Sequence, residues 1–457
     1  MDTQPQSNHP SVISAQLTPY DALDLAFTFE DRHQHEWWKR AGPVLGLTMR
    51  HARYDLNKQY QYLAFFARQI IPLLGPFPES AGSDYQRGFI PLEVSQNFQQ
   101  SGTTVRLCFE PRTYSGYAIA KDPFGDLLVQ EVVAKLGQVR GVKVDLQMFR
   151  QLASILNLTK DEEEELYQPA CYENLPPTFK IQNIVGIQLP RSGNITLKAD
   201  WFLSAKSLVS TIPITELSFE AIRTVDQGKN LFTPGLRPIE EYFRSMEMQP
   251  ASPSHPRTTE FNAIACHLDD STNARLKIYL SERLLKFDRV ADIWTLGGRL
   301  KNCPGISQGL ELVRALWSIL QIKEGHHFPL AVNSLMMKGG DPASLAAAEK
   351  EDYPETQFFD EQFLVLNFEI RPGDPWPQPK IYFLLTELAD NKVADAVVAL
   401  FNRLGWVEEA SRYKENLAAY YPHRDLDKTS GLQRFLSFSY SAKNGPYTSV
   451  YHWGIGG

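Results

Sequence analysis

The sequence has few cysteines and no long apolar run. Its four cysteines, Cys108, Cys171, Cys266 and Cys303, lie far apart in 457 residues, and no Cys-x-x-Cys spacing occurs. A disulfide framework and a structural zinc site are therefore not expected. No stretch reaches the roughly 18 consecutive apolar residues of a membrane span, and the N-terminus lacks an apolar signal core. We expect a soluble, cytoplasmic protein.

An excess of positive charge is also missing. Lys and Arg number 46 against 53 Asp and Glu, which gives a net charge of −7. Such a chain is not a default binder of nucleic acid or of anionic membranes. The glycine-rich phosphate-binding patterns of P-loop and dinucleotide-binding proteins are absent as well. Any cationic site must therefore be local and built from side chains.

Long linkers between independent domains are absent. The loop-like stretches Gln249–Thr258, Gly339–Tyr353 and Pro372–Pro379 are short. A length of 457 residues is enough for two or three domains. Without linkers, we instead predict one domain over residues 1–457, with about the first 18 residues flexible.

Paired β-like runs separated by turn residues recur along the chain and predict five hairpins. The pairs are Gly88–Asn97 with Thr103–Glu110, Lys180–Leu189 with Ile195–Leu203, Phe261–Leu268 with Ala274–Leu280, Phe363–Ile370 with Lys380–Leu385, and Phe435–Ser441 with Tyr447–Trp453. Helical periodicity fills the intervals. It predicts helices over Asp126–Leu136, Leu146–Leu156, Ile306–Leu320, Val393–Leu404 and Val407–Tyr421. Five helix–helix–strand–strand (ααββ) repeats predict an α+β fold, a closed ten-stranded antiparallel β-barrel surrounded by helices.

Strand alternation places every second residue on one face, and on several predicted strands that face carries cations and tyrosines. The cations are Arg106, Lys198, Arg275, Lys277 and Lys380, and the tyrosines are Tyr279, Tyr382 and Tyr451. One interpretation is an ordinary sheet whose polar face lies in water. The other places this face inside the barrel, because amphipathic helices need an apolar sheet surface outside. A cationic lumen would require an anionic ligand, and diphosphate fits because Arg and Lys give it charge-assisted hydrogen bonds.

Two acidic features bear on this chemistry. Glu93 shares a strand face with Ser95 and Asn97, where its carboxylate would accept a hydrogen bond from an N–H group, although a solvated strand glutamate is the simpler interpretation. Asp269–Asn273 (DDSTN) resembles aspartate-rich motifs that bind Mg-diphosphate, but its residue types are those of a hairpin turn. We therefore predict a turn there, no metal site, and a diphosphate held by side-chain cations.

Several short motifs, in order along residues 85–453, resemble the fungal aromatic (indole) prenyltransferases of the dimethylallyltryptophan synthase family. They are Pro91–Asn97 (PLEVSQN), Val105–Pro111 (VRLCFEP), Lys198, Ala274–Tyr279 (ARLKIY), Trp294–Arg299 (WTLGGR), Lys380–Tyr382 (KIY), Glu387–Lys392 (ELADNK), Phe438–Tyr440 (FSY), Gly445–Tyr447 (GPY) and Val450–His452 (VYH). The resemblance implies a ten-stranded barrel with a polar lumen. It also implies transfer of a dimethylallyl group from dimethylallyl diphosphate, the co-substrate, to an indole ring, with no metal and no further cofactor.

The resemblance assigns roles to residues of this chain. Glu93 matches the catalytic glutamate that binds the indole N–H. Arg106, Lys198, Arg275 and Lys277 match diphosphate-binding positions, and Lys380 stands where some members have glutamine. Tyr279, Tyr382 and Tyr451 match the tyrosines that shield the allyl cation, and Tyr440 and Tyr447 are assigned to the same shield from the last hairpin.

Three departures concern the acceptor pocket. Asp200 stands where members commonly have a shield tyrosine, and its neighbour Trp201 should face the other way. Ile184 replaces a lysine that serves as base in tryptophan-using members, which argues against free tryptophan. Cys108 is small, so a bulky acceptor such as a tryptophan-containing cyclic dipeptide or a related indole alkaloid would fit.

Other interpretations remain open. Asp200 is compatible with the same chemistry on a quinone, a phenolic or another polycyclic aromatic acceptor. A non-catalytic barrel that binds a phosphorylated ligand is a further alternative. We expect small-molecule partners only, no nucleic acid or membrane, and a monomer or homodimer.

Overall fold

The computed structural model describes residues 17–77, 92–112, 122, 124–168, 175, 177–248, 258–270, 272–327, 358–359, 364–386 and 388–452. Residues 1–16, most of the segment predicted to be flexible, lie outside this description. Thr18 belongs to regular structure, because its side chain accepts a hydrogen bond from Asp21 and caps helix α1 (Pro19–Ala26).

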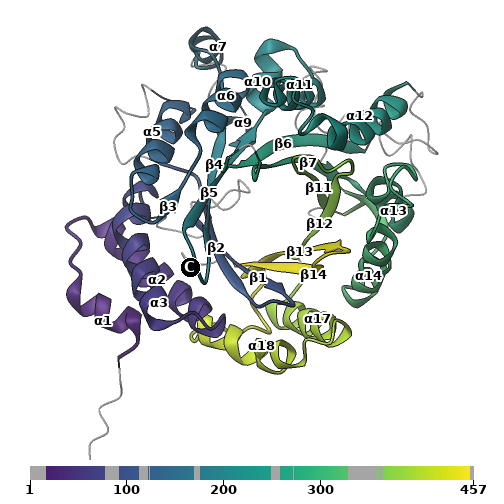
Figure 1. Ribbon diagram of the computed structural model, residues 1–457. Helices are drawn as coiled ribbons and strands as arrows, with labels where there is room; N and C mark the ends of the chain where they lie inside the picture. The colour runs from purple at the N-terminus through teal and green to yellow at the C-terminus, as the bar shows by residue number, and fades with distance from the viewer. Residues whose placement is uncertain are drawn as a thin grey trace, which may run out of the picture.

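A closed β-barrel forms the centre of the molecule (Figure 1). Its strands are β1 (Leu92–Gln99), β2 (Thr104–Phe109), β4 (Asn183–Leu189), β5 (Ile195–Phe202), β6 (Thr259–His267), β7 (Arg275–Glu282), β11 (Leu364–Ile370), β12 (Gln378–Leu384), β13 (Gln433–Ser441) and β14 (Gly445–His452). They are paired in the order β5-β4-β2-β1-β14-β13-β12-β11-β7-β6, and β5 pairs with β6 to close the ring. The predicted ten-stranded antiparallel barrel is confirmed.

The five predicted hairpins are β1–β2, β4–β5, β6–β7, β11–β12 and β13–β14, all antiparallel. Residues 88–91 of the first predicted strand lie outside the described residues. A short strand that the sequence pattern did not predict, β3 (Val142–Lys143), pairs in parallel with β5 at the rim. Outside the barrel, β8 (Leu284–Leu285), β9 (Gly325–His327) and β10 (Phe358–Phe359) form a separate small sheet.

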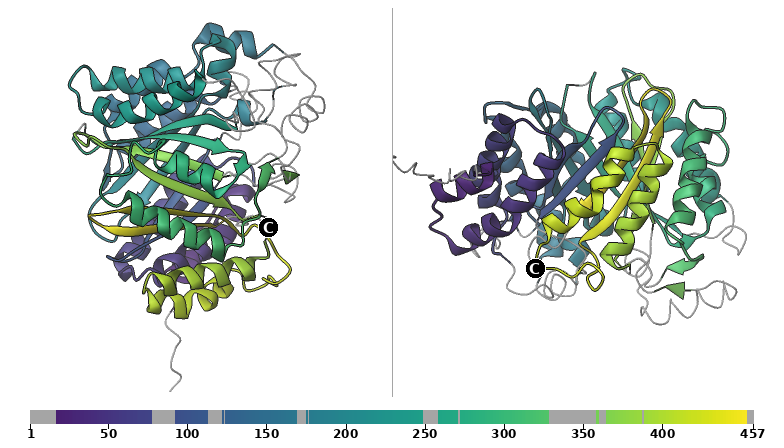
Figure 2. Two further views of the ribbon diagram at one scale, coloured as in Figure 1. Left: turned by 90° about the vertical axis from the view of Figure 1, so that its right-hand side faces the viewer. Right: turned by 90° about the horizontal axis from the view of Figure 1, so that it is seen from below.

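Helices surround the barrel on all sides (Figures 1 and 2). After α1 they are α2 (Arg32–His51), α3 (Leu56–Phe65), α5 (Asp126–Gly137), α6 (Leu146–Leu156), α7 (Lys160–Leu166), α9 (Pro177–Lys180), α10 (Ser204–Ser210), α11 (Ile214–Asp226), α12 (Thr233–Glu247), α13 (Phe287–Trp294), α14 (Ile306–Ile319), α17 (Asp390–Arg403) and α18 (Val407–Tyr420). Among the described residues, each hairpin is preceded by at least two helices, as the ααββ repeat predicts, and the first three repeats carry additional short ones. No helix of the described residues is long and apolar enough to cross a membrane.

Local sequence explains where these helices begin and which side they bury. At α6, Asp145 accepts hydrogen bonds from the backbone N–H groups of Gln147 and Met148, which caps the helix. Its buried residues, among them Phe149 and Leu152, recur at helical spacing. Phe149 packs against Trp201 of β5, with ring centres 5.6 Å apart. The helix therefore covers the outer surface of the barrel.

The main apolar core lies between the barrel and the helices. Leu276, Ile278 and Leu280 of β7 are fully buried within it. Trp201 also belongs to it, with its indole N–H bonded to Asn157, so the prediction that Trp201 faces away from Asp200 is confirmed. Because the apolar faces of the strands point outward, their polar faces point into the lumen. The interpretation of an ordinary sheet with its polar face in water is wrong.

Candidate active site in the barrel lumen

The five predicted cations meet in the lumen, although they come from β2, β5, β7 and β12. The effect of placing these cations together is clearest in the pKa values of Lys277 and Lys380. Burial, together with the charges of Lys198, Arg275 and Arg106, lowers the pKa of Lys277 to about 8, although Glu369 acts in the opposite direction. Burial and the neighbouring cations likewise hold the pKa of Lys380 well below its usual value. Like charges in a largely buried space disfavour protonation, so this group of cations would gain from an anion.

Two lumenal carboxylates balance three of the five cations. Lys198 Nζ lies 2.8 Å from the Asp200 carboxylate, and it donates to the Tyr279 hydroxyl at 3.2 Å. Burial opposes the charge of Lys198, but Asp200 outweighs it and raises the pKa of that lysine. Lys198 is thus held between the Asp200 carboxylate and the Tyr279 phenol.

Glu369 of β11 is the second lumenal carboxylate that pairs with these cations, and it was not predicted from the sequence. Its carboxylate lies 3.2 Å from Lys277 Nζ, 4.0 Å from Arg275 Nη1 and 2.7 Å from Arg371 Nη2. Burial alone would raise its pKa, but Lys277, Arg275 and Arg371 hold the pKa of Glu369 well below its usual value. The sequence does contain a pattern that could have identified Glu369, since Val365, Asn367 and Glu369 are every second residue of one predicted strand and share one face.

Arg106 and Lys380 differ from the other three cations. Within the described residues neither forms an ion pair, and Arg106 Nε is buried without a hydrogen-bond partner. Both instead lie over the Tyr447 ring, at 5.8 Å for the Arg106 guanidinium carbon and 4.9 Å for Lys380 Nζ. A buried guanidinium with an unused donor is costly unless an anion or water satisfies it. These two residues are therefore the strongest candidates for anion binding.

A row of tyrosines lines the lumen beside the cations. The Tyr382 ring centre lies 6.1 Å from that of Tyr279 and 5.9 Å from that of Tyr451. Asn367 donates a hydrogen bond to the Tyr382 hydroxyl at 3.0 Å. Burial raises the pKa of all three phenols well above the usual value, so they stay neutral. Neutral π faces at this spacing can stabilise a cation without reacting with it.

The structure brings Tyr447 into the lumen but not Tyr440. The Tyr447 hydroxyl donates to Asn97 Oδ1 at 2.9 Å. Tyr440 packs outside the barrel, where its side chain adjoins Gly305 and Gly309 at the start of α14. Tyr447 of β14 pairs with Ser439 of β13, and Tyr440 is the next residue after Ser439, so it points to the opposite face of the sheet. The prediction that Tyr440 belongs to the lumenal shield is therefore wrong in its placement.

The predicted acceptor residues lie on adjacent strands. Glu93 of β1 is directly across from Cys108 of β2, which is across from Gly186 of β4. Ile184 and Asp200 face each other on β4 and β5. Burial, together with the charge of Glu93, raises the pKa of Cys108 to about 12. Gly186 lets Lys198 and Cys108 approach closely, since a Cβ on this glycine would lie 3.3 Å from Lys198 Cβ and 3.6 Å from Cys108 Sγ.

The aspartate-rich segment forms a turn, as predicted. Asp270 accepts hydrogen bonds from the Thr272 backbone N–H and from the Asn273 side chain, and Lys143 pairs with Asp269 at 2.6 Å. In the described part of the chain, no group of three His, Cys, Asp or Glu side chains is arranged to hold a metal ion.

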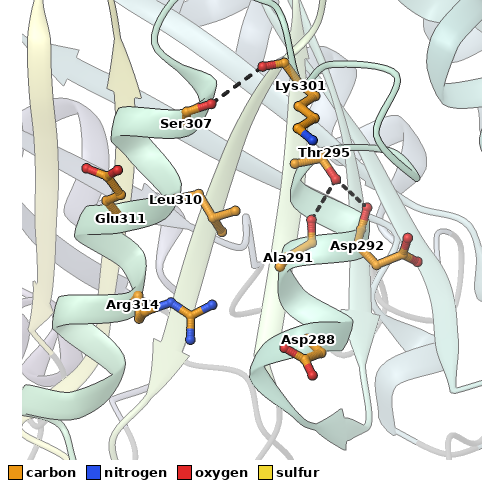
Figure 3. Close-up of a pocket in the computed structure, with 9 residues that line it drawn as sticks. All are labelled: Asp288, Ala291, Asp292, Thr295, Lys301, Ser307, Leu310, Glu311 and Arg314. Atoms are coloured by element: carbon orange, nitrogen blue, oxygen red, sulfur yellow. Dashed lines mark hydrogen bonds between the residues drawn. The ribbon is translucent and has the colours of Figure 1, made fainter.

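A second hollow, of about 550 Å³, lies between α13 and α14, outside the barrel (Figure 3). None of the predicted site residues lines it. It includes Ser307, which stands in a Gly-x-Ser-x-Gly sequence like that around serine-hydrolase nucleophiles. The serine lies in the first turn of α14 and does not follow a strand, and no histidine is among the described residues lining the hollow. A hydrolase site is not supported there.

Comparison with known proteins decides the family. The model of the tryptophan dimethylallyltransferase family matches residues 33–416. The chain belongs to this family. A verruculogen prenyltransferase from Neosartorya fischeri is 58% identical over 457 residues, all of both chains. The crystal structure of AnaPT from Neosartorya fischeri has a TM-score of 0.79 at 28% identity, covering 96% of this chain and 99% of that one. NotF in complex with brevianamide F and DMSPP has a TM-score of 0.77 at 29% identity, covering 96% and 98%.

As a member of the tryptophan dimethylallyltransferase family, the protein is a prenyltransferase of the indole-modifying class. The family is named for the transfer of a dimethylallyl group, and the crystal structure of NotF contains DMSPP. The barrel inferred from hairpin counting is the fold of the chain's solved relatives.

Proposed function

We propose that the lumen transfers a dimethylallyl group from dimethylallyl diphosphate to the indole ring of a tryptophan-containing cyclic dipeptide or a related indole alkaloid. The observation that carries this proposal is the pair Arg106 and Lys380. Both are lumenal cations without an ion pair in the described residues, and both lie over the Tyr447 ring. They offer an anion two charges next to an aromatic surface, which is what an allyl diphosphate needs.

The diphosphate binds to Arg106 and Lys380, with Lys198, Arg275 and Lys277 completing the site. As the C–O bond of the donor breaks, its electron pair goes to the diphosphate, and these cations stabilise the developing charge. Lys277 and Lys380 have lowered pKa values because burial and like charges disfavour their protonation. A bound diphosphate removes that penalty, so the site is strongest when the leaving group is fully charged.

The allyl cation that remains is held by Tyr279, Tyr382 and Tyr451, with Tyr447 on the side of the diphosphate. Their neutral rings stabilise positive charge through their faces, and their packing excludes water that would convert the cation to an alcohol. Asp200 stands in place of a further shield tyrosine. On that side the allyl cation therefore faces the Asp200 carboxylate and Lys198, and not an aromatic ring.

The acceptor lies against Glu93, which accepts a hydrogen bond from the indole N–H and orients the ring toward the cation. The small side chain of Cys108, directly across from Glu93, suits a bulky acceptor. Ile184 offers no base, which disfavours free tryptophan. The names of relatives agree with this, since the family includes a verruculogen prenyltransferase and a deoxybrevianamide E synthase.

A second candidate keeps the donor and changes the acceptor to a quinone, a phenolic or a non-indole polycyclic compound. Asp200 favours it, because a carboxylate beside Lys198 suits an acceptor with an additional hydrogen-bond donor. A cytoplasmic location and a monomeric or homodimeric state remain predictions.

Incubation of the enzyme with dimethylallyl diphosphate and a panel of acceptors tests the proposal. The panel contains tryptophan, brevianamide F, verruculogen, a naphthoquinone and a simple phenol, in buffer with EDTA. We expect diphosphate release and a mass gain of one dimethylallyl group with brevianamide F or verruculogen. Product only from the quinone or the phenol would support the second candidate. No product from any acceptor, with donor bound, would support a non-catalytic barrel.

A further inference from the structure

Glu369 is a lumenal carboxylate that none of the roles above uses. It lies on β11, directly across from Lys277 on β7 and from Gln378 on β12. Only 13% of its side chain is exposed, and its oxygens lie 3.2 Å from Lys277 Nζ and 4.0 Å from Arg275 Nη1. A carboxylate so largely removed from water is costly unless its partners are themselves held in place.

Charged and titratable groups face Glu369 from every neighbouring element. Lys277 and Arg275 come from β7, Arg371 from the end of its own strand, and His267 from β6. More distant cations act on Lys277 from β2 and β5, through Arg106 and Lys198. Lys380 of β12 also acts here, because its own pKa responds to both Lys277 and Glu369.

His267 contributes no positive charge at neutral pH, because burial and the nearby cations hold its pKa well below the usual value. Glu369 is therefore the anion that offsets mutual repulsion between Lys277 and Arg275. Without it, either a proton would leave Lys277 or the two side chains would move apart.

We propose that Glu369 is an internal counter-ion that holds Lys277 and Arg275 in place before the donor binds and shares them with the diphosphate afterwards. The inference rests on the proposed donor site and makes Glu369 a positioning residue. A fixed carboxylate beside two diphosphate-binding cations has two effects. It keeps Lys277 protonated at neutral pH. It also competes with the diphosphate product for Lys277 and Arg275, and this competition speeds product release.

The two effects change the affinity for diphosphate in opposite directions, and each dominates at a different pH. In Glu369→Gln, the competing charge is gone, so at acid pH, where Lys277 keeps its proton, diphosphate binds more tightly. As pH rises, Lys277 loses its proton earlier than in the wild type, so affinity declines sooner. A merely structural glutamate would change neither the midpoint of this decline nor the affinity at its acid end.

The test is calorimetric titration of inorganic diphosphate into wild type, Glu369→Gln and Glu282→Gln across a pH series spanning the Lys277 pKa of about 8. Glu282 is a matched control, a buried strand glutamate that faces outward and pairs with Arg289 at 3.0 Å. We expect wild-type and Glu282→Gln affinity to decline with a midpoint near 8. For Glu369→Gln, we expect a midpoint about 1–3 pH units lower and tighter binding at the acid end.

Glu369→Asp keeps the charge but draws it back by one methylene, and a smaller shift in the same direction is expected. This variant decides the question if the glutamine variant does not fold. An unchanged midpoint and acid-end affinity in the Glu369 variants, or an equal shift in Glu282→Gln, would overturn the inference alone. A wild-type protein that binds no diphosphate would contradict the proposed donor site as well.

Discussion

The Arg106 guanidinium lies over the ring of Tyr447, 5.8 Å from its centre, although the two residues are far apart in the chain. Lys380 Nζ lies 4.9 Å from the same ring centre. One aromatic ring is thus shared by the two lumenal cations that form no ion pair in the described residues. Because β1 lies between β2 and β14, this arrangement depends on the pairing of β1 with β14, which joins the first and last hairpins of the barrel. The pairing of these two hairpins therefore creates the anion site.

Replacing Arg106 with glutamine is expected to weaken donor binding. A charge-assisted hydrogen bond to a buried anion contributes about 1.5–3 kcal/mol, which corresponds to about 10- to 150-fold in affinity. The KM for dimethylallyl diphosphate should rise by that factor while the KM for the acceptor changes little. Steady-state kinetics with each substrate varied in turn measure this.

The control for that variant is Arg314→Gln, which removes an exposed arginine from α14 outside the barrel. It should retain the wild-type donor KM. Equal effects of the two substitutions would show that net charge, and not the lumenal position, governs donor binding.

Glu93→Gln is expected to lower kcat with an indole acceptor. The amide keeps the shape of the side chain but replaces a charged acceptor with a neutral one, which weakens the hydrogen bond to the indole N–H. A loss of about 10- to 100-fold is expected if the bond strengthens as the ring attacks. Diphosphate affinity, measured in the same preparation, should stay at the wild-type value. Near-wild-type turnover by the glutamine variant would remove Glu93 from the proposed mechanism.

Replacing Tyr382 with leucine is expected to divert the allyl cation to water. Its ring stands between those of Tyr279 and Tyr451, so its loss opens the middle of the shield. The ratio of dimethylallyl alcohol to prenylated product should rise, whereas Tyr382→Phe, which keeps the π face, should stay close to wild type. Tyr440→Leu, outside the barrel, should not change the ratio. The shield role fails if Tyr382→Leu gives the wild-type product ratio.

Donor binding is expected to take up protons in mildly alkaline solution. A lysine side chain is charged at pH values below its pKa. Burial and nearby cations lower the pKa of Lys277 to about 8 and hold the pKa of Lys380 well below its usual value. Near pH 8 a substantial fraction of Lys277 is neutral, and a bound diphosphate raises the pKa of that lysine, so protons are bound with it. Proton uptake should shrink as pH falls below 8 for Lys277. Calorimetry in buffers of different ionisation enthalpy measures it, and proton release would contradict the account.

Much of the fold was predictable because the short strands are marked by a two-residue period and by the turns between them. Leu276, Ile278 and Leu280 alternate with Arg275, Lys277 and Tyr279, and this alternation alone separates the two faces of the strand. The face that meets the helices must be apolar, so the cations had to point inward. The pairing of β5 with β6 that closes the barrel depends on contacts between distant segments, and no local pattern encodes it.

The predicted site was less complete than the fold. The sequence pattern suggested that all five lumenal cations need a ligand, whereas Asp200 and Glu369 already balance some of them. Glu369 could have been predicted, because polar and apolar residues alternate along its strand as clearly as along the others. Tyr440 was misplaced because motif resemblance in the last hairpin outweighed the alternation that puts it opposite Ser439 and Ser441.

A crystal structure with dimethylallyl thiolodiphosphate bound tests the central claim most directly. The account predicts the diphosphate in the lumen, with its oxygens within hydrogen-bonding distance of Arg106 and Lys380, and the allyl group against Tyr382. A diphosphate bound elsewhere, for example in the hollow between α13 and α14, would contradict it.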